Sequence, residues 1–493
     1  MKKIIKLIIV TTILSLGYSC GNDFLDQQPS EFLTTDQISE AAETNPGVIK
    51  GTMTGIYSLT FETGTGGTRG HDDFGQKAYD IFGDFLSGDM ALSVSTYGWY
   101  RASITEFQAP LDFTFLDNYQ VWRYYYRIIR SANLVIDALG GNDAVPDLDE
   151  NKYLLGQAKA IRAHSYFYLT QYFSNSYNPS AEILPLYDEL SDQNGPKVAT
   201  SVIYDLMEKD LNDAISLLDG FNRTAKNEIN KPVAQGILAY VLGSRGDKYQ
   251  EVANLTSDVI STGGFNLMSS SEITAGFNNV NTSGWMWGID LTPDTGLGLV
   301  SWWGQMDVFT YSYAWAGDAK AIDAGLYDAI PADDARKAQF NYNPGSYYHL
   351  LPINKFYDPN RQIGGQTVIT TDYVYMRVAE MYLLNAEANA MIGNDAAART
   401  SLKDLLGQRI PNTSYVDGLS GQDLINEIYL QTRIELWGEG KSYLAMKRNK
   451  ATIVRGSNHL SYVGEPISFD DERLTFEIPE SEIQNNPFIS TQN

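Results

Sequence analysis

The side chains best suited to binding chemistry in this chain are aromatic, and they are unevenly distributed. Five of the eight tryptophans fall within residues 285–315, where they share the stretch with three further rings: Trp285, Trp287, Trp302, Trp303, Trp315, Phe309, Tyr311 and Tyr313. A flat aromatic surface matches the C–H face of a sugar ring, and an indole or phenol adds a hydrogen-bonding edge. The cluster therefore predicts a carbohydrate-binding region, with Trp302, Trp303, Tyr313 and Trp315 as candidate contacts. Core packing, the ordinary use of aromatic residues, remains the alternative.

A second aromatic group lies about 200 positions earlier, at Tyr97, Trp99 and Tyr100. Charged side chains nearby can pair with sugar hydroxyls, and we take Arg101 and Asp72 as candidate partners of this kind. Tyr97 and Trp99 are the candidate stacking residues. The two groups together suggest an aromatic arc that follows the curvature of a glycan.

Patterns typical of catalysis or metal binding are weak. The four histidines are widely scattered and have no metal-ligand spacing, and no G-x-S-x-G nucleophile motif occurs. Glycoside hydrolysis needs two carboxylates at a set separation, and 60 acidic residues supply chance pairs without singling one out. Asp290 and Asp294 loosely resemble a calcium loop, but their spacing departs from the EF-hand pattern. We predict no catalytic residues, no metal and no cofactor, and hydrolysis stays open only as a third reading.

The charge balance excludes some partners. The formal net charge is −24, with 60 acidic against 36 basic residues in 493. This charge repels nucleic acid and suits a ligand that is neutral or cationic, although acidity also serves solubility alone. Hydrophobic residues make up 43% and charged residues 19%, which is typical of a globular protein.

The amino terminus has the order of a bacterial lipoprotein signal. Lys2, Lys3 and Lys6 precede an apolar run at residues 7–16, which is too short to span a bilayer. The only cysteine, Cys20, falls at the expected cleavage point, where its thiol can be lipidated. We therefore predict a signal peptide at residues 1–19 and a lipid anchor, with palmitate among its acyl chains, at Cys20.

Helical hairpins organise the rest of the chain. Residues 373–407 carry an apolar stripe that is interrupted at Gly393-Asn394, with small residues at Ala386 and Ala398 where two helices would approach closely. This pattern resembles a tetratricopeptide hairpin, a unit that needs neighbours of the same kind to bury its stripe. Further helices are expected at the following ranges: 37–59, 119–139, 153–173, 201–218, 232–245, 250–262 and 422–448. By contrast, residues 263–371 show no long helical period, which predicts a loop-rich insertion packed on the scaffold. Residues 475–487 predict a short extended segment that leads into a turn.

Several motifs, in their order, resemble the SusD/RagB family of outer-membrane nutrient-binding lipoproteins. The motifs are FLDQQP at 24–29, GQAKAIRAHSYFYLTQYF at 156–173, LYDAIPADDARK at 326–337, RVAEMYLLNAEANAMIGN at 377–394, RIELWGEGKSYLAMKR at 433–448 and FEIPESEIQNNP at 476–487. The similarity extends from Cys20 to the carboxyl terminus. It implies a mostly helical fold with four tetratricopeptide-like hairpins, divided into an N-terminal region at 20–262 and a C-terminal region at 263–493 that contains the loop-rich insertion 263–371.

The resemblance also implies a function. Members capture oligosaccharides at the outer membrane and deliver them to a partner, a SusC-like TonB-dependent transporter, over which they sit as a lid. We expect a non-catalytic, lipid-anchored surface protein, and the family's habit of building its arc from both aromatic regions favours Trp99. A peptide-binding uptake component of the RagB type, or a helical-repeat lid that gates the transporter without binding sugar, remain the alternatives.

Overall fold

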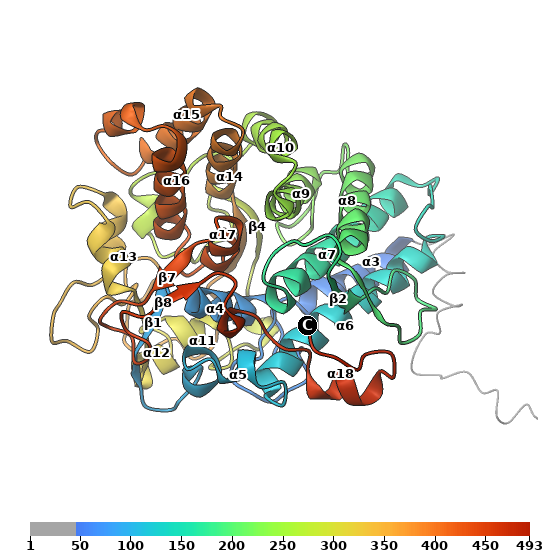
Figure 1. Ribbon diagram of the computed structural model, residues 1–493, viewed down its shortest axis with the longest axis horizontal. Helices are drawn as coiled ribbons and strands as arrows, with labels where there is room; N and C mark the ends of the chain where they lie inside the picture. Colours follow the sequence, from blue (N-terminus) through green and yellow to red (C-terminus); the bar gives the residue numbers. More distant parts are fainter. Residues whose placement is uncertain (1–45) are drawn as a thin grey trace, which may run out of the picture.

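The computed structural model describes residues 46–493, and Figure 1 shows these residues in colour. The expectations for the signal peptide, for Cys20 and for the start of the first helix at residue 37 lie outside these described residues. The remainder is mostly helical, as predicted, and its longer helices are α3 (Pro46–Ser58), α4 (Gln76–Leu86), α6 (Leu116–Ala138), α7 (Asp149–Phe173), α8 (Thr200–Leu217), α9 (Lys231–Arg245), α10 (Tyr249–Thr262), α14 (Val378–Met391), α15 (Asp395–Leu406) and α16 (Gly421–Glu435).

The long helices form a continuous stack. Each of the successive pairs from α6 to α10 is in contact, and α10 then packs on α14, which packs on α15 and α16. In Figure 1 the stacked helices α8, α9, α10, α14, α15 and α16 lie along the upper side of the molecule, and α6 lies lower. Beneath the upper helices lie β1 (Met90–Ser95), β7 (Thr452–Val454), β8 (Pro466–Ser468), α11 (Trp302–Met306) and α12 (Tyr313–Ala316). The stack contains helices that precede residues 263–371 in the sequence and helices that follow them. These residues are therefore an insertion between two neighbouring helices of the scaffold, α10 and α14.

The hairpin turn predicted at Gly393-Asn394 is confirmed, and Gly246 forms a second glycine turn between α9 and α10. Gly246 ends α9 with φ 81° and Gly393 follows α14 with φ 76°, and this left-handed conformation is one that glycine adopts at little cost. Ala386 and Ala398 are buried in one apolar cluster formed by α14, α15 and α16. Small side chains at these points allow the helix backbones to approach closely.

Two predicted helices have different bounds in the structure. Residues 373–377 form strand β6 (Tyr373–Arg377), which is buried along its whole length against β4 (Trp285–Ile289), so α14 begins only at Val378. The helix expected at 422–448 is broken into α16 and α17 (Ser442–Arg448), because Gly438 and Gly440 adopt positive φ between them. In the tail, the extended segment is followed by a short helix, α18 (Glu480–Asn485).

The described strands form two-stranded antiparallel pairs. β1 (Met90–Ser95) pairs with β5 (Asp318–Ile322), β2 (Glu182–Pro185) with β3 (Lys197–Ala199), and β7 (Thr452–Val454) with β8 (Pro466–Ser468), in addition to β4 with β6. The β1–β5 pair matters most for function, because it places the early aromatic segment beside the late one. Three short helices, α11 (Trp302–Met306), α12 (Tyr313–Ala316) and α13 (Ala324–Ala329), lie in the insertion.

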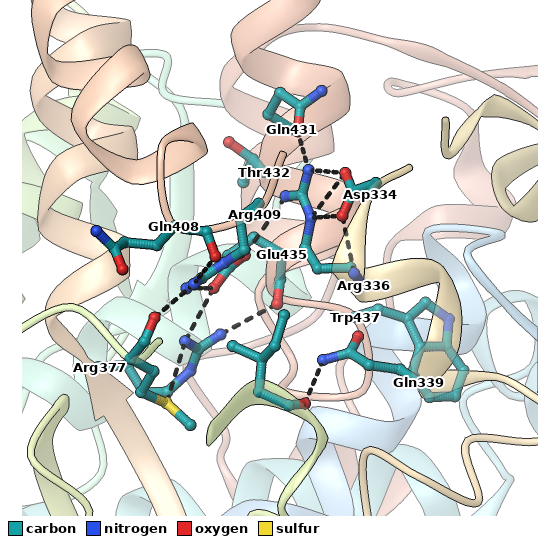
Figure 2. Close-up of polar contacts among 12 residues, drawn as sticks. Asp334, Arg336, Gln339, Arg377, Gln408, Arg409, Gln431, Thr432, Glu435 and Trp437 are labelled. Atoms are coloured by element: carbon teal, nitrogen blue, oxygen red, sulfur yellow. Dashed lines mark hydrogen bonds and ion pairs between the residues drawn. The ribbon is translucent and has the colours of Figure 1, made fainter. Parts of the chain in front are cut away.

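A buried network of charges fastens the insertion to the scaffold (Figure 2). Glu435 at the end of α16 forms ion pairs with Arg409 at 2.8 Å, with Arg377 at 3.1 Å and with Arg336 of the insertion at 3.4 Å. Burial alone would raise the pKa of the Glu435 carboxyl, but the guanidinium groups of Arg409, Arg377 and Arg336 hold it well below its usual value. Buried charges of this kind persist only where each has its partners, so the network fixes one arrangement of these segments.

Candidate functional site

The loop after β1 is held against the insertion by one buried carboxylate. Asp318 at the start of β5 accepts hydrogen bonds from the backbone N–H groups of Thr96 at 2.7 Å, Tyr97 at 2.9 Å and Trp99 at 3.1 Å. Gly317 lies so close that an added Cβ would sit 2.4 Å from the Thr96 hydroxyl oxygen. The clamp fixes the position from which Tyr97 and Trp99 project.

Four rings from three segments meet here, and we call His71, Tyr97, Trp99 and Tyr313 the aromatic platform. His71 lies parallel to Trp99, with ring centroids 5.2 Å apart and an interplanar angle of 5°. Tyr313 of α12 packs on Trp99 at 5.7 Å and on Tyr97 at 5.4 Å, and its hydroxyl group lies 2.7 Å from His71 Nδ1. Such offset and edge contacts hold aromatic side chains in fixed orientations.

Two more rings flank the platform: Tyr311, just before α12, and Trp315, within α12. Trp315 packs against Tyr311 at 5.8 Å and against Gly364 of the neighbouring loop. Tyr311 is held in place by its backbone N–H, which donates to Gln366 O at 2.8 Å, and Ser312 caps the helix by accepting from Trp315 N. Tyr97, Tyr311 and Trp315 are 59%, 48% and 38% exposed, so this side of the platform is open to solvent. Exposed aromatic rings in this number are typical of a binding surface.

The backbone beneath the platform is strained. Tyr100 and Phe107 both have positive φ, at 65° and 61°, and residues Arg101–Thr105 between them form a π-helix, η3. Positive φ is costly for a bulky residue and persists only where the surroundings impose it. Because such strain and π-helices cluster at functional sites, they support the assignment of this loop to one.

A polar layer supports the platform from below. Gln305 of α11 donates to the backbone oxygen of His71 at 2.8 Å, and the buried Lys320 of β5 donates to Gln305 Oε1 at 3.0 Å. Burial lowers the pKa of the Lys320 ammonium group to about 7, against the raising effect of nearby Asp318. His71 is therefore positioned through its backbone as well as through its ring.

The structure places several predicted contact residues away from the surface. Trp302 and Trp303, with Trp285 and Trp287, are buried in the core, and Trp303 has no exposed surface. Asp72 is also buried, and desolvation together with the charge of Asp117 raises its pKa to about 8. These residues therefore cannot meet a ligand from solvent, and we correct the candidate set accordingly. Arg101 stays exposed but is engaged in an ion pair with Glu106 at 3.0 Å.

The structure brings Tyr97, Trp99 and Tyr313 together, but Tyr313 is buried, so it supports the other two rings and does not itself face solvent. The structure also adds residues that the sequence did not single out. His71 lies in a glycine-rich loop at 63–73, and no aromatic residue close to it in the sequence indicated the ring contacts that it makes. Asp318 is one acidic residue among many in the sequence. Only the β1–β5 pairing distinguishes it, and no local motif could have done so.

Within residues 46–493, no group of three or more His, Cys, Asp or Glu side chains is arranged to hold a metal ion. In the same part of the chain, no helix is both long and apolar enough to cross a membrane. The fold and the site together define a helical-repeat scaffold of tetratricopeptide-like hairpins that presents aromatic side chains to solvent.

Comparison with known proteins identifies the family. A model described as the SusD family matches residues 308–493, and a second, described as "Starch-binding associating with outer membrane", matches residues 87–242. The chain belongs to the SusD family.

Individual relatives agree with this assignment. A SusD-like carbohydrate-binding protein of Bacteroides vulgatus is 25% identical, with a TM-score of 0.75 over 90% of this chain and 97% of that one. A SusD superfamily protein of Bacteroides thetaiotaomicron is 24% identical, with a TM-score of 0.75 over 91% and 99%. The SusD-like protein P25 of Formosa agariphila is 20% identical over 293 residues, a match that spans 59% of this chain but only 53% of that relative.

Proposed function

We propose that this chain is a non-catalytic glycan-binding protein of the outer membrane, which captures oligosaccharide on the aromatic platform. The observation that carries the proposal is the packing of Tyr97 and Trp99 on the buried ring of Tyr313, beside the exposed rings of Tyr311 and Trp315. A sugar ring stacks on such rings, and the rim hydroxyl groups find phenol, indole and backbone partners.

The family relationship supports the same function. One matching model is described as starch-binding and associated with the outer membrane, and a similar solved structure is described as carbohydrate-binding. Delivery of the captured glycan to a SusC-like TonB-dependent transporter follows from this proposal. So does anchoring to the outer leaflet through a lipid on Cys20, and Cys20→Ala should then release the protein from the membrane fraction.

The direct test is retardation in native gels that contain polysaccharides. The parent protein is expected to be retarded by at least one polysaccharide of a broad panel, and Trp99→Ala is expected to lose that retardation. Removal of one stacking platform from a shallow site costs about 1–3 kcal/mol, which is tenfold or more in affinity. The melting temperature of Trp99→Ala should stay near that of the parent, because Trp99 is only half-buried.

Trp303→Ala is the control for Trp99→Ala, because it removes a buried tryptophan and should change stability. Trp303 is a core residue, and its removal should cost about 3–5 kcal/mol of stability through the cavity that it leaves. A parent protein that no polysaccharide retards would favour the lid that gates the transporter without binding sugar. Release of shortened sugars during incubation would instead show that the protein is a hydrolase.

A further inference from the structure

A row of arginines stands out on a chain whose net charge is strongly negative. Arg123, Arg127 and Arg130 lie at spacings of four and three residues on α6, so they share one face of the helix, and all three are exposed. Within residues 46–493, none of them forms an ion pair. Most other arginines of the described chain pair with carboxylates, so this row is a local concentration of unneutralised positive charge.

The row lines a hollow of about 380 Å³ between α6, the 187–194 loop and the start of α18. This volume is within the range of small-molecule sites, about 300–1,000 Å³. In Figure 1, α6 and α18 lie close together at the lower right of the molecule. We define the arginine hollow by its three arginines and by Tyr119, Tyr126 and Tyr187.

The walls of the arginine hollow combine rings with polar groups. Tyr126 and Tyr187 pack edge to face at 5.6 Å, and both remain partly exposed, as does Tyr119. Gln193 and Asn194 at its rim are exposed and carry amide donors and acceptors. Rings together with amides suit a saccharide, and exposed guanidinium groups suit carboxylate or sulfate groups on it.

Three carboxylates also line the hollow, and two of them are engaged elsewhere. Asp192 accepts from the backbone N–H groups of Asp188 at 2.8 Å and Glu189 at 2.9 Å. Glu482 of α18 accepts from Nδ2 of Asn486, the residue that follows the helix, at 2.8 Å. Glu189 is exposed at the rim. Within residues 46–493, none of these carboxylates forms an ion pair with the three arginines, so the guanidinium N–H groups keep donors for a ligand.

The arginine hollow and the aromatic platform share one loop. Arg127 Nη1 lies 3.5 Å from the backbone oxygen of Thr65, and Arg123 packs on Gly67. His71 of the platform follows Thr65 by only six residues, a stretch that spans at most about 22 Å when fully extended. One extended polysaccharide segment can therefore reach both.

We infer that the arginine hollow is a second subsite, selective for anionic sugars, and that the captured glycan carries carboxylate or sulfate groups. The inference rests on the proposed glycan-binding function and names its ligand class. The negative charge of the whole chain does not oppose it at contact distance, because salt screens charges beyond about 8 Å under physiological conditions.

Calorimetric titration of the full chain with defined sugars tests the inference. Oligogalacturonides supply carboxylates, sulfated carrageenan oligosaccharides supply sulfates, and malto- and xylo-oligosaccharides are the neutral probes. The parent should bind one of the two acidic classes, and tenfold or more weakly at 300 mM than at 50 mM salt. Arg123→Gln, Arg127→Gln and Arg130→Gln combined should reduce this affinity at least tenfold while the melting temperature is kept, because all three side chains are exposed.

The matched control removes the same three charges elsewhere. Lys209→Gln, Lys231→Gln and Lys403→Gln combined change exposed ion pairs of α8, α9 and α15, and acidic-sugar affinity should not move. The inference is overturned if the parent ignores both acidic classes, or if the triple arginine variant binds them as the parent does.

Two further outcomes distinguish this inference from the proposal for the aromatic platform and from binding of an acidic peptide in the hollow. If Trp99→Ala leaves all glycan binding intact while the arginine variant loses it, the platform proposal fails and the arginine hollow stands. Residues 21–45 of the chain itself carry six acidic and no basic residues. If a synthetic peptide of that sequence outcompetes every acidic sugar, the hollow binds an acidic peptide segment and the glycan inference is wrong.

Discussion

At the scale of single residues, Asp318 has the largest influence on the site without touching its surface. It is fully buried, and its carboxylate accepts hydrogen bonds from three backbone N–H groups of the loop that carries Tyr97 and Trp99. Hydrogen bonds to an ionised acceptor contribute more than neutral ones, about 1.5–3 kcal/mol each. We therefore regard Asp318 as a positioning residue of the aromatic platform.

Replacing this carboxylate tests that role. In Asp318→Asn one oxygen becomes an NH₂ group, which cannot accept from a backbone N–H, so the loop should lose part of its order. Glycan affinity is expected to fall about tenfold, and Trp99 should become more accessible to acrylamide in fluorescence quenching. A purely structural role would lower the melting temperature and leave the quenching of the folded protein unchanged.

The control is the same substitution at Asp294, an exposed residue of the insertion. Asp294→Asn should match the parent in glycan affinity and in quenching. If Asp318→Asn also matches the parent in both, the clamp does not position the platform.

At the scale of elements, the hairpin of α14 and α15 connects the preceding helices of the stack, through α10, with α16. Ala386 and Ala398 are both fully buried in the cluster between these helices and α16. Leu402, Leu405 and Leu424 belong to the same buried cluster, and protein interiors of this kind are close-packed.

Enlarging one alanine should therefore force the helices apart. Ala386→Leu is expected to destabilise the protein by about 1–3 kcal/mol, measured as a lower melting temperature and a lower urea midpoint. Ala396→Leu is the matched control, because Ala396 is exposed on the first turn of α15 and should tolerate the larger side chain. Equal stability of the two variants would show that the alanine contact does not limit helix approach.

At the scale of the whole molecule, the buried charge network makes stability depend on pH. Glu439 pairs with Arg377 at 2.7 Å and with Lys355 at 2.8 Å. Burial would raise its pKa, but the charges of Arg377 and Lys355 outweigh burial and lower the pKa to about 2. A carboxyl whose pKa is lower in the folded state stabilises the protein above its unfolded pKa of about 4.3. That contribution is lost as the pH falls from there toward 2.

The free energy of unfolding, measured with urea, should therefore fall steadily between pH 5 and pH 3. Glu439→Gln should lower stability at pH 7 by about 3–5 kcal/mol, because it leaves buried cations unpaired, and should flatten the acid dependence. Glu465→Gln, which changes an exposed pair with Arg473, is the control and should alter neither quantity much. An unchanged pH profile in Glu439→Gln would assign the acid sensitivity to other groups.

The sequence by itself determined the helical scaffold and the family. Apolar periodicity, the glycine turns at Gly246 and Gly393 and the buried alanines are local features, and each acts within one hairpin. For this reason the helices from α6 to α10 and the α14–α15 turn were predictable to within a few residues. The aromatic composition of two distant segments also pointed to Trp99, Tyr97 and Tyr313.

Only the tertiary structure decided which aromatic residues face solvent. Trp303 and Trp315 lie in equally aromatic sequence, yet one is fully buried and the other 38% exposed, because burial depends on what packs from elsewhere in the chain. The same holds for β6, whose strand state is imposed by pairing with β4, 84 or more positions away, against a local helical pattern. The same reason explains why the sequence did not predict His71 as part of the platform or Asp72 as buried. Long-range contacts determine the surroundings of both residues, and no local spacing encodes those contacts.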